Sequence, residues 1–140
     1  MRLVLDTSVI VAAFRSRAGA SFRLLELLRD GRFVAVATPS LFFEYESVLK
    51  RPEQRPIHAL SDEQLEDAIQ GLSVLMEPVR IDFQWRPQLP DPDDELVLEA
   101  AINGSAHAII THNVRDFAPV MKRFGIQVLP PGVIIKQRFL

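Results

Sequence analysis

Runs of apolar residues alternate with helix-like stretches from one end of the chain to the other. Residues 2–5 show no alternation of hydrophobic and polar positions, a pattern typical of a parallel strand covered on both faces. Because no repeat or hinge-like linker interrupts the alternation, the pattern predicts one α/β domain over residues 1–140. The apolar runs predict strands over residues 2–5, 33–37, 108–111 and 126–129.

Helix signals stand at the ends of the intervening stretches. Thr38 and Pro39 supply a capping hydroxyl and a first-turn proline. Ser61 and Gln64 match a capping box, in which the two side chains satisfy free backbone N–H groups. These signals predict helices over residues 21–29, 40–50 and 61–76.

The stretch over residues 77–92 is rich in proline. Its four prolines permit at most a short edge strand over 79–83, because proline has no backbone N–H to donate to a sheet. Asp91 and Pro92 then start the next predicted helix.

Net charge and composition limit the kinds of binding site that the chain can form. The formal net charge is -2 and the pI is near 5.9, so any nucleic-acid binding needs a local basic patch. Cysteine is absent, which excludes a disulfide framework and a thiolate metal site. The histidines, His58, His107 and His112, lack the spacing of a zinc site, and we assign none of them a ligand role.

The start of the chain bears on where the protein works. Asp6 breaks the first apolar run far short of the length that a secretory or membrane segment needs. We therefore expect a soluble, cytoplasmic protein without a membrane partner.

Carboxylates or an amide stand at the ends of several predicted elements. Asp6 ends the first strand, and Asn113 and Asp116 follow a later one. Glu44 lies on a predicted helix and Asp94 near the start of another. Ligands of parallel sheets bind where the carboxyl ends of the strands meet. The arrangement predicts an acidic metal pocket at that edge.

Structural interpretations of these residues remain open beside the functional ones. Asp6, followed by Thr7 and Ser8, either caps a helix or belongs to a site whose hydroxyls orient a water. The segment that contains Asp116 is also typical of an ordinary Asn/Asp turn.

The helix after Pro92 leaves a similar choice. At 100 degrees per residue, Glu95 and Glu99 fall on a polar stripe, whereas Asp94 falls on the apolar side and needs a partner there. Alternatively, Asp94 caps the helix and complements its dipole, which is the favoured interpretation for Asp91 and Asp93.

Four stretches of the chain carry a family resemblance: residues 5–9, 39–52, 91–101 and 110–117. In order and spacing they resemble the PIN-domain family of metal-dependent ribonucleases. They are most similar to the VapC-like toxins of bacterial toxin-antitoxin pairs. The resemblance covers nearly the whole chain and implies a three-layer α/β/α sandwich around a central parallel sheet.

The resemblance also assigns roles by position. It implies that Asp6, Glu44 and Asp94 are catalytic, metal-binding carboxylates. Periodicity does not choose between Glu44 and Glu46, which border the apolar arc of their helix on opposite sides, and the resemblance selects Glu44.

The fourth ligand is the departure from the family pattern. Asn113 stands where many members have an aspartate, so either Asn113 binds through its carbonyl or a water, or Asp116 substitutes as ligand and catalytic residue. Hard cations are held chiefly by anionic oxygens, and we therefore expect one firm cation site.

An endoribonuclease that depends on Mg²⁺ or Mn²⁺ follows from these assignments. Carboxylates a few Å apart stay ionised near pH 7 only if a cation compensates their charge. Such a cation polarises a phosphodiester and activates water, and the resemblance implies a 5′ phosphate and a 3′ hydroxyl as products. Candidate contacts to the RNA phosphates are Arg15, Arg17, Arg51 and Arg55.

The resemblance implies three partners, namely the RNA substrate, a cognate antitoxin protein and a second copy in a homodimer. An antitoxin that inserts a basic side chain into the acidic pocket is electrostatically natural. The apolar residues 133–135, with Phe139 and Leu140, either contribute to dimer contacts or pack on the core of their own chain.

Two other hypotheses compete with the nuclease. A non-catalytic PIN module that binds RNA or a protein partner is suggested by Asn113 and by the modest net charge. A phosphotransfer protein, either a receiver or a haloacid-dehalogenase-like phosphatase, is disfavoured. Ser8 stands where the phosphatase pattern has a second aspartate, two residues after Asp6.

Overall fold

The computed structural model describes residues 1–84 and 86–137. In these ranges five parallel strands form a sheet in the order β3-β2-β1-β4-β5, with β1 at its centre. Four strands lie where the apolar runs predict them, each within one residue of the expected bounds. The strands are β1 (Arg2–Leu5), β2 (Val34–Ala37), β3 (Met76–Pro78), β4 (Ala108–Ile110) and β5 (Gln127–Leu129).

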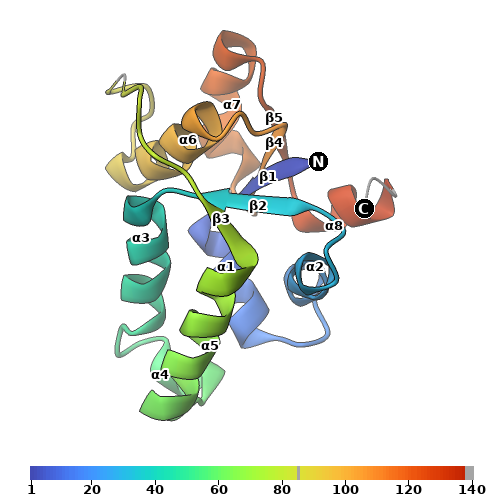
Figure 1. Ribbon diagram of the computed structural model, residues 1–140, viewed down its shortest axis with the longest axis vertical. Helices are drawn as coiled ribbons and strands as arrows, with labels where there is room; N and C mark the ends of the chain where they lie inside the picture. The colour runs from blue at the N-terminus through green and yellow to red at the C-terminus, as the bar shows by residue number, and fades with distance from the viewer. Residues whose placement is uncertain (85, 138–140) are drawn as a thin grey trace.

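Helices cover both faces of this sheet. They are α1 (Thr7–Arg15), α2 (Ala20–Arg29), α3 (Pro39–Leu49), α4 (Arg55–His58), α5 (Asp62–Leu75), α6 (Pro92–Asn103), α7 (Val114–Phe124) and α8 (Pro131–Lys136). Figure 1 shows α6 and α7 on one side of the sheet and α1, α2, α3 and α5 on the other. The predicted three-layer α/β class is confirmed. Among the helices of the described residues, none has the length and apolar character needed to cross a membrane.

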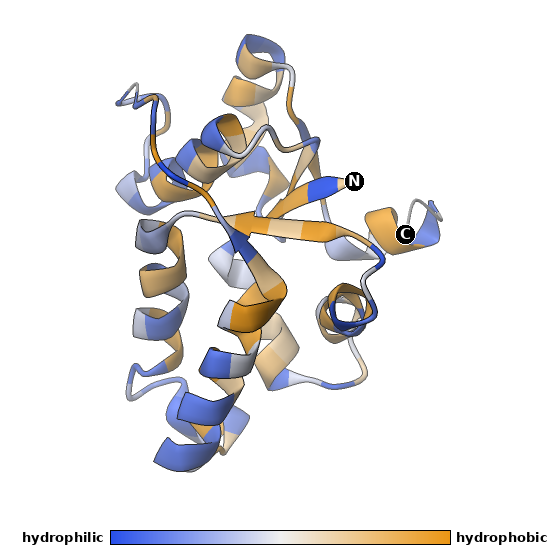
Figure 2. Cartoon of the chain, viewed as in Figure 1, coloured by the Kyte–Doolittle hydropathy of each residue, from blue (hydrophilic) through white to orange (hydrophobic). Residues whose placement is uncertain are grey.

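The centre of the sheet is fully buried. Leu3, Val4 and Leu5 of β1 and Ile109 and Ile110 of β4 are each 0% exposed. In Figure 2 the strands are predominantly hydrophobic, whereas α4 and the nearby start of α5 are hydrophilic. Because β1 and β4 pair in parallel, the residues that follow them start side by side at one edge, called the carboxyl edge below.

The predicted caps of α3 and α5 are present. The Thr38 hydroxyl accepts a hydrogen bond from the Leu41 backbone N at 3.2 Å. Ser61 and Gln64 form both hydrogen bonds of the capping box, at 2.9 and 3.1 Å. These local signals define where the two helices begin because they satisfy backbone N–H groups that have no partner inside the helix.

The edge strand predicted over 79–83 is wrong. α5 runs directly into β3, where Pro78 lies opposite Ala37 of β2. The Val79 backbone N still donates to the Ala37 carbonyl at 3.0 Å, and the chain then leaves the sheet. The position of β3 is decided by its pairing with β2, which the residues of the strand do not reveal on their own.

The polar stripe of α6 is buried rather than exposed. The strap, defined here as residues 79–84 and 86–91, runs over α6, and Glu95 and Glu99 are each only 3% exposed. Glu95 accepts hydrogen bonds from the backbone N of Gln88 and of Leu89, the latter at 2.7 Å. Glu99 accepts from Arg86, with Nη2 and Oε2 at 2.8 Å.

Two helices follow the carboxyl edge without having been predicted. The residues of α1 continue the apolar character of β1, and Val9 and Ile10 are 0% exposed, so hydrophobicity alone does not separate strand from helix there. α7 contains Pro119 inside the helix, where proline is normally a breaker.

Residues 133–135 lie on α8, which contacts α2, and Ile134 is 1% exposed. This part of the tail therefore packs on the core of its own chain. Phe139 and Leu140 lie outside the described residues.

Candidate metal centre

Asp6 occupies the middle of the carboxyl edge. Its backbone N donates to the Ile110 carbonyl at 2.9 Å, which extends the pairing of β1 with β4 by one residue. Asp6 is 6% exposed, and its Oδ2 accepts hydrogen bonds from Ser8 Oγ at 2.6 Å and Thr111 Oγ1 at 2.7 Å. The side chain does not cap α1. By position Asp6 is nevertheless the N-cap residue of α1, as the helix-cap interpretation predicts, and its carboxylate is held in one orientation by two hydroxyls.

Thr111 is a site residue that the sequence reasoning missed. Its hydroxyl donates to Asp6 Oδ2 and accepts from the Asn113 backbone N at 2.9 Å. One signal could have revealed it. Thr111 is a hydroxyl residue that directly follows an apolar run, as Asp6 does, and the two runs form the paired strands β4 and β1. Of the two hydroxyl residues predicted to orient a water, Ser8 is engaged with Asp6. Thr7 is half-buried at the start of α1.

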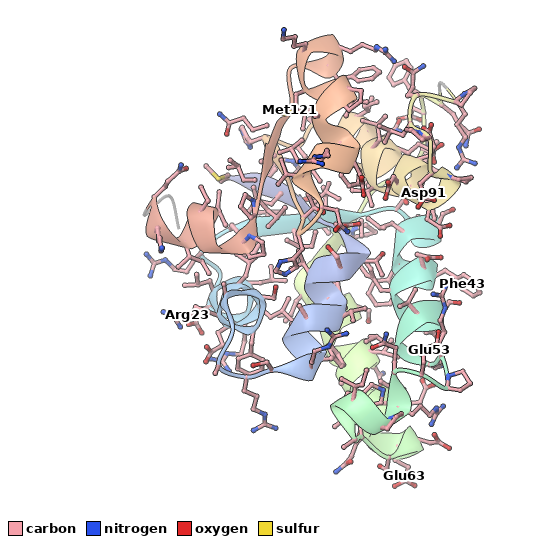
Figure 3. All side chains as sticks on the ribbon, turned by 180° about the vertical axis from the view of Figure 1, so that it is seen from behind. Arg23, Phe43, Glu53, Glu63, Asp91 and Met121 are labelled. Atoms are coloured by element: carbon pink, nitrogen blue, oxygen red, sulfur yellow. The ribbon has the colours of Figure 1, made fainter. Side chains whose placement is uncertain are left out.

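Among the acidic residues of the site, Asp94 has the most strongly raised pKa. Its pKa is raised from 3.8 to about 7, chiefly by burial and then by the charges of Asp6, Asp91, Asp116 and Asp93, in that order. Asp91 is the N-cap of α6 and accepts from the Asp93 backbone N at 2.9 Å, so the capping role favoured for Asp91 is confirmed. Asp94 thus lies half-buried among carboxylates of three elements. In Figure 3, Asp91 marks the start of α6, close to the start of α3.

Glu44 of α3 is oriented toward the same acidic region. Burial raises its pKa, as do the charges of Asp93 and Asp91, while Arg51 lowers it. Glu46 instead forms an ion pair with Lys50 at 3.2 Å. The structure therefore distinguishes two glutamates that helical periodicity leaves equivalent.

Tyr45 joins α3 to the end of β1. Its hydroxyl donates a hydrogen bond to the Leu5 carbonyl, and the side chain is 1% exposed. Burial and the charge of Asp6 raise the pKa of Tyr45 well above its usual range, so the phenol remains a neutral donor. This contact fixes the helix that carries Glu44 against the strand that precedes Asp6.

Asn113 and Asp116 lie at the start of α7, and both are exposed. The Asp116 backbone N donates to the Asn113 carbonyl at 3.0 Å. The segment is the first turn of a helix and not an isolated Asn/Asp turn. Only Asp116 carries a charge, and that charge raises the pKa of Asp94.

The carboxylates approach one another without forming a closed coordination shell. Within residues 1–84 and 86–137, no group of three His, Asp or Glu side chains is arranged as a metal site. The donor set nevertheless suits a hard cation, because carboxylate and amide oxygens are the ligands that Mg²⁺ and Mn²⁺ prefer. The raised pKa of Asp94 supports the fit, since a cation would offset the repulsion that raises it.

The four candidate arginines have different surroundings. Arg51 is close enough to Glu44 to lower its pKa. Arg55 forms an ion pair with Asp62, and Arg17 borders an apolar groove formed by α1, α2, α4 and α5. Arg15 lines a concavity that also contains Ser8 and His112. Arg51 is therefore the candidate that the structure brings close to an acidic residue, and Arg15 lies on a concavity that reaches Ser8 beside Asp6.

Comparison with known proteins identifies the family and the fold of the chain. The family model described as PIN domain matches residues 2–115, and the chain belongs to this family. No curated protein matches the chain in sequence. Fourteen chains of solved structures match. One of them belongs to the crystal structure of VapBC2 from Rickettsia felis bound to a DNA fragment from their promoter. It is 17% identical with a TM-score of 0.59, over 92% of this chain and 97% of that chain. The predicted family and fold are confirmed.

Proposed function

We propose that this protein is a metal-dependent endoribonuclease, the toxin of a toxin-antitoxin pair. The observation that carries the proposal is the half-buried Asp94, whose pKa is raised first by burial and then by the charges of Asp6 and the other nearby aspartates. Family membership supports it, because PIN domains are generally metal-dependent nucleases, and so does the fold shared with a chain of VapBC2.

Asp6, Glu44 and Asp94 would hold Mg²⁺ or Mn²⁺, with Asn113 or Asp116 as a further ligand. The chemistry such a cation supplies is polarisation of a phosphodiester and activation of water. Ser8 and Thr111 hold the Asp6 carboxylate in place, with Oδ2 accepting from both hydroxyls. A ligand that is already oriented loses less conformational freedom when it binds. The products are a 5′ phosphate and a 3′ hydroxyl.

The experiment that tests the proposal is cleavage of a labelled RNA pool by purified protein with Mn²⁺, and with EDTA in its place. We expect Asp94→Asn to lower the cleavage rate by at least about 100-fold, the loss typical of removing a group that acts in the transition state. Asp67→Asn, on the exposed face of α5, is the matched control and should cleave like the wild type. Cleavage that survives EDTA, or that is equal in Asp94→Asn and wild type, would contradict the proposal.

The structure also favours one alternative, a non-catalytic PIN module that binds RNA or protein. The observations behind it are the open arrangement of the carboxylates among the described residues and the neutral Asn113. In that case Asp6→Asn and Asp94→Asn leave RNA binding intact, and neither variant nor wild type cleaves.

The proposed partners are an antitoxin and a second copy of the chain. The VapBC2 structure supports the first by analogy of fold. Expression of the wild-type protein in a bacterial host should arrest growth, whereas Asp94→Asn should not. Growth arrest by both proteins would indicate that toxicity does not depend on the acidic site.

A further inference from the structure

A concavity beside Asp6 is lined by one face of α1 and by the residue that follows Thr111. Its lining residues are Ser8, Val11, Ala12, Arg15 and His112. Ser8 and Arg15 are seven residues apart, so they share a face of the helix. At about 1.5 Å per residue, Arg15 lies roughly 10 Å from Ser8 along the axis of α1. The concavity thus extends from the acidic edge along this helix.

His112 is held at the mouth of the concavity by hydrogen bonds. Its backbone N donates to Ser8 Oγ at 3.2 Å, and Ser8 Oγ in turn donates to Asp6 Oδ2 at 2.6 Å. Its ring Nε2 is hydrogen-bonded to Ser21 Oγ of α2 at 2.8 Å, and Ser21 is only 3% exposed. When the Ser21 hydroxyl donates to Nε2, the proton of the neutral ring is on Nδ1. In that arrangement Nδ1 can donate to a ligand on the side away from α2.

The chemistry of the concavity suits an anion with an apolar part. Arg15 is exposed in the last turn of α1, and no ion pair to it is present among the described residues. Its guanidinium is therefore available to bind an anion. Val11 and Ala12 are half-buried between Arg15 and Ser8, and they provide an apolar floor. A cation and a ring N–H on either side of such a floor match a nucleotide, whose phosphate is anionic and whose sugar has an apolar face.

We propose that this concavity binds single-stranded RNA next to the scissile bond. In this proposal the Ser21 hydroxyl donates to His112 Nε2, and Arg15 and His112 Nδ1 donate to phosphates at the two ends of the apolar floor. This inference rests on the proposed function, because the acidic edge defines where the scissile phosphate lies. Ser21 acts as a positioning residue through the His112 ring. The subsite explains how a chain with a net charge of -2 can hold a polyanion beside the six carboxylates of the acidic region.

The test uses wild-type protein and single substitutions in two assays with one single-stranded RNA. Cleavage with Mn²⁺ gives kcat and KM, and fluorescence anisotropy in EDTA gives Kd as a function of salt. We expect Arg15→Gln and His112→Gln each to raise KM about five- to tenfold with kcat within about twofold, as loss of one charge-assisted hydrogen bond predicts. Arg15→Gln should also reduce the slope of log Kd against log salt by about 0.7, the value for one phosphate of a single strand.

Arg32→Gln is the matched control, because Arg32 is exposed and lies before β2, at the opposite edge of the sheet. It should change neither KM nor the salt slope. Ser21→Ala should raise KM less than His112→Gln does, and combining the two should be no worse than His112→Gln alone. This non-additivity is not expected if Ser21 only stabilises the fold.

The outcomes separate this inference from the proposed function. If wild type cleaves RNA and both Arg15→Gln and His112→Gln keep its KM and salt slope, the subsite is overturned while the nuclease stands. If wild type does not cleave but both variants weaken RNA binding in EDTA, the nuclease is overturned and the subsite stands. Equal effects of Arg15→Gln and Arg32→Gln would show that Arg15 contributes only nonspecific electrostatic attraction, and this result would overturn the subsite.

Discussion

At the scale of single residues, burial and repulsion between carboxylates together govern the acidic site. The pKa of Asp94 is raised from 3.8 to about 7, first by burial and then by its acidic neighbours. A carboxyl whose pKa is higher in the folded than in the unfolded protein favours folding only while it is protonated. Its contribution to stability is complete below about pH 4 and is lost as the pH rises through about 7.

We therefore expect Asp94→Asn to stabilise the metal-free protein at alkaline pH. The free energy of unfolding at pH 8 should rise by about 1 to 2 kcal/mol, an amount reduced for the partial exposure of the group. At pH 4 the difference should vanish, because the aspartate is then neutral like the asparagine. Urea denaturation at both pH values, in EDTA, measures this. An equal difference at both pH values would point to packing rather than charge.

Metal binding should offset the destabilising effect of the ionised Asp94 carboxylate at alkaline pH. With Mn²⁺ at about 100 times its Kd, the wild-type protein at pH 8 should gain about 2.7 kcal/mol in its free energy of unfolding. Asp6→Asn and Asp94→Asn should lose most of this gain, whereas the control Asp67→Asn should keep it. Thermal denaturation with and without Mn²⁺ gives the result without any assay of cleavage. A gain that is the same in all four proteins would place the cation elsewhere.

At the scale of elements, the strap decides the surroundings of α6. Asn103 fastens it, since its side-chain oxygen accepts from the Asp82 and Phe83 backbone N at 2.7 Å each. Its amide nitrogen donates to the carbonyls of Phe83 and Glu99, both at 2.8 Å. The strap also buries Glu95 Oε2, which has no hydrogen-bond partner among the described residues. The helix that carries Asp94 is thus covered on its polar side by a segment held by hydrogen bonds, by the Arg86–Glu99 ion pair and by the buried Val79 and Leu89 side chains.

Asn103→Ala should loosen the strap and leave α6 in place. We expect the free energy of unfolding to fall by about 1 to 3 kcal/mol, because the four hydrogen bonds of the Asn103 side chain are lost. Limited proteolysis should cut faster within residues 79–91. Asn113→Ala is the control on an exposed amide, and it should leave the cutting pattern unchanged. If the Asn103→Ala variant is cut no faster than the wild type, the strap is held by something other than this amide.

At the scale of the whole molecule, the layers pack so closely that single atoms matter. Gly104 follows α6, and a Cβ there would lie 2.7 Å from the Ala100 carbonyl oxygen and 2.8 Å from Val36 Cγ2 of β2. Gly71 lies inside α5, where a Cβ would meet nothing within 4 Å. Substitution of glycine by alanine therefore tests a tight contact between layers at Gly104 and helix propensity at Gly71.

Gly104→Ala should lower the free energy of unfolding by about 1 to 3 kcal/mol through overpacking. Gly71→Ala should raise it by about 0.4 to 1 kcal/mol, because the unfolded chain loses conformational freedom. Denaturant titrations of both variants against the wild type measure the two signs. A Gly104→Ala variant as stable as Gly71→Ala would show that α6 and β2 can move apart without cost.

Local patterns in the sequence determined a large part of this structure. Four strands were evident as apolar runs, because a strand buried on both faces has no polar positions. The caps at Thr38 and Ser61 were also evident, because capping involves side chains and backbone groups only three residues apart. The positions of Asp6 and Asp94 relative to these elements followed from the same local signals.

Tertiary structure decided the features that depend on contacts between distant segments. The position of β3 depends on pairing with β2, and the burial of Glu95 and Glu99 depends on the strap that crosses α6. The Thr111 hydroxyl reaches Asp6 only because β4 lies beside β1, across 105 residues of sequence. Hydrophobic periodicity reports which side of an element is covered when a core lies on one side of it. It contains no information on which other segment covers that side. The sequence therefore determined the local elements, and only the tertiary structure decided which distant segments contact them.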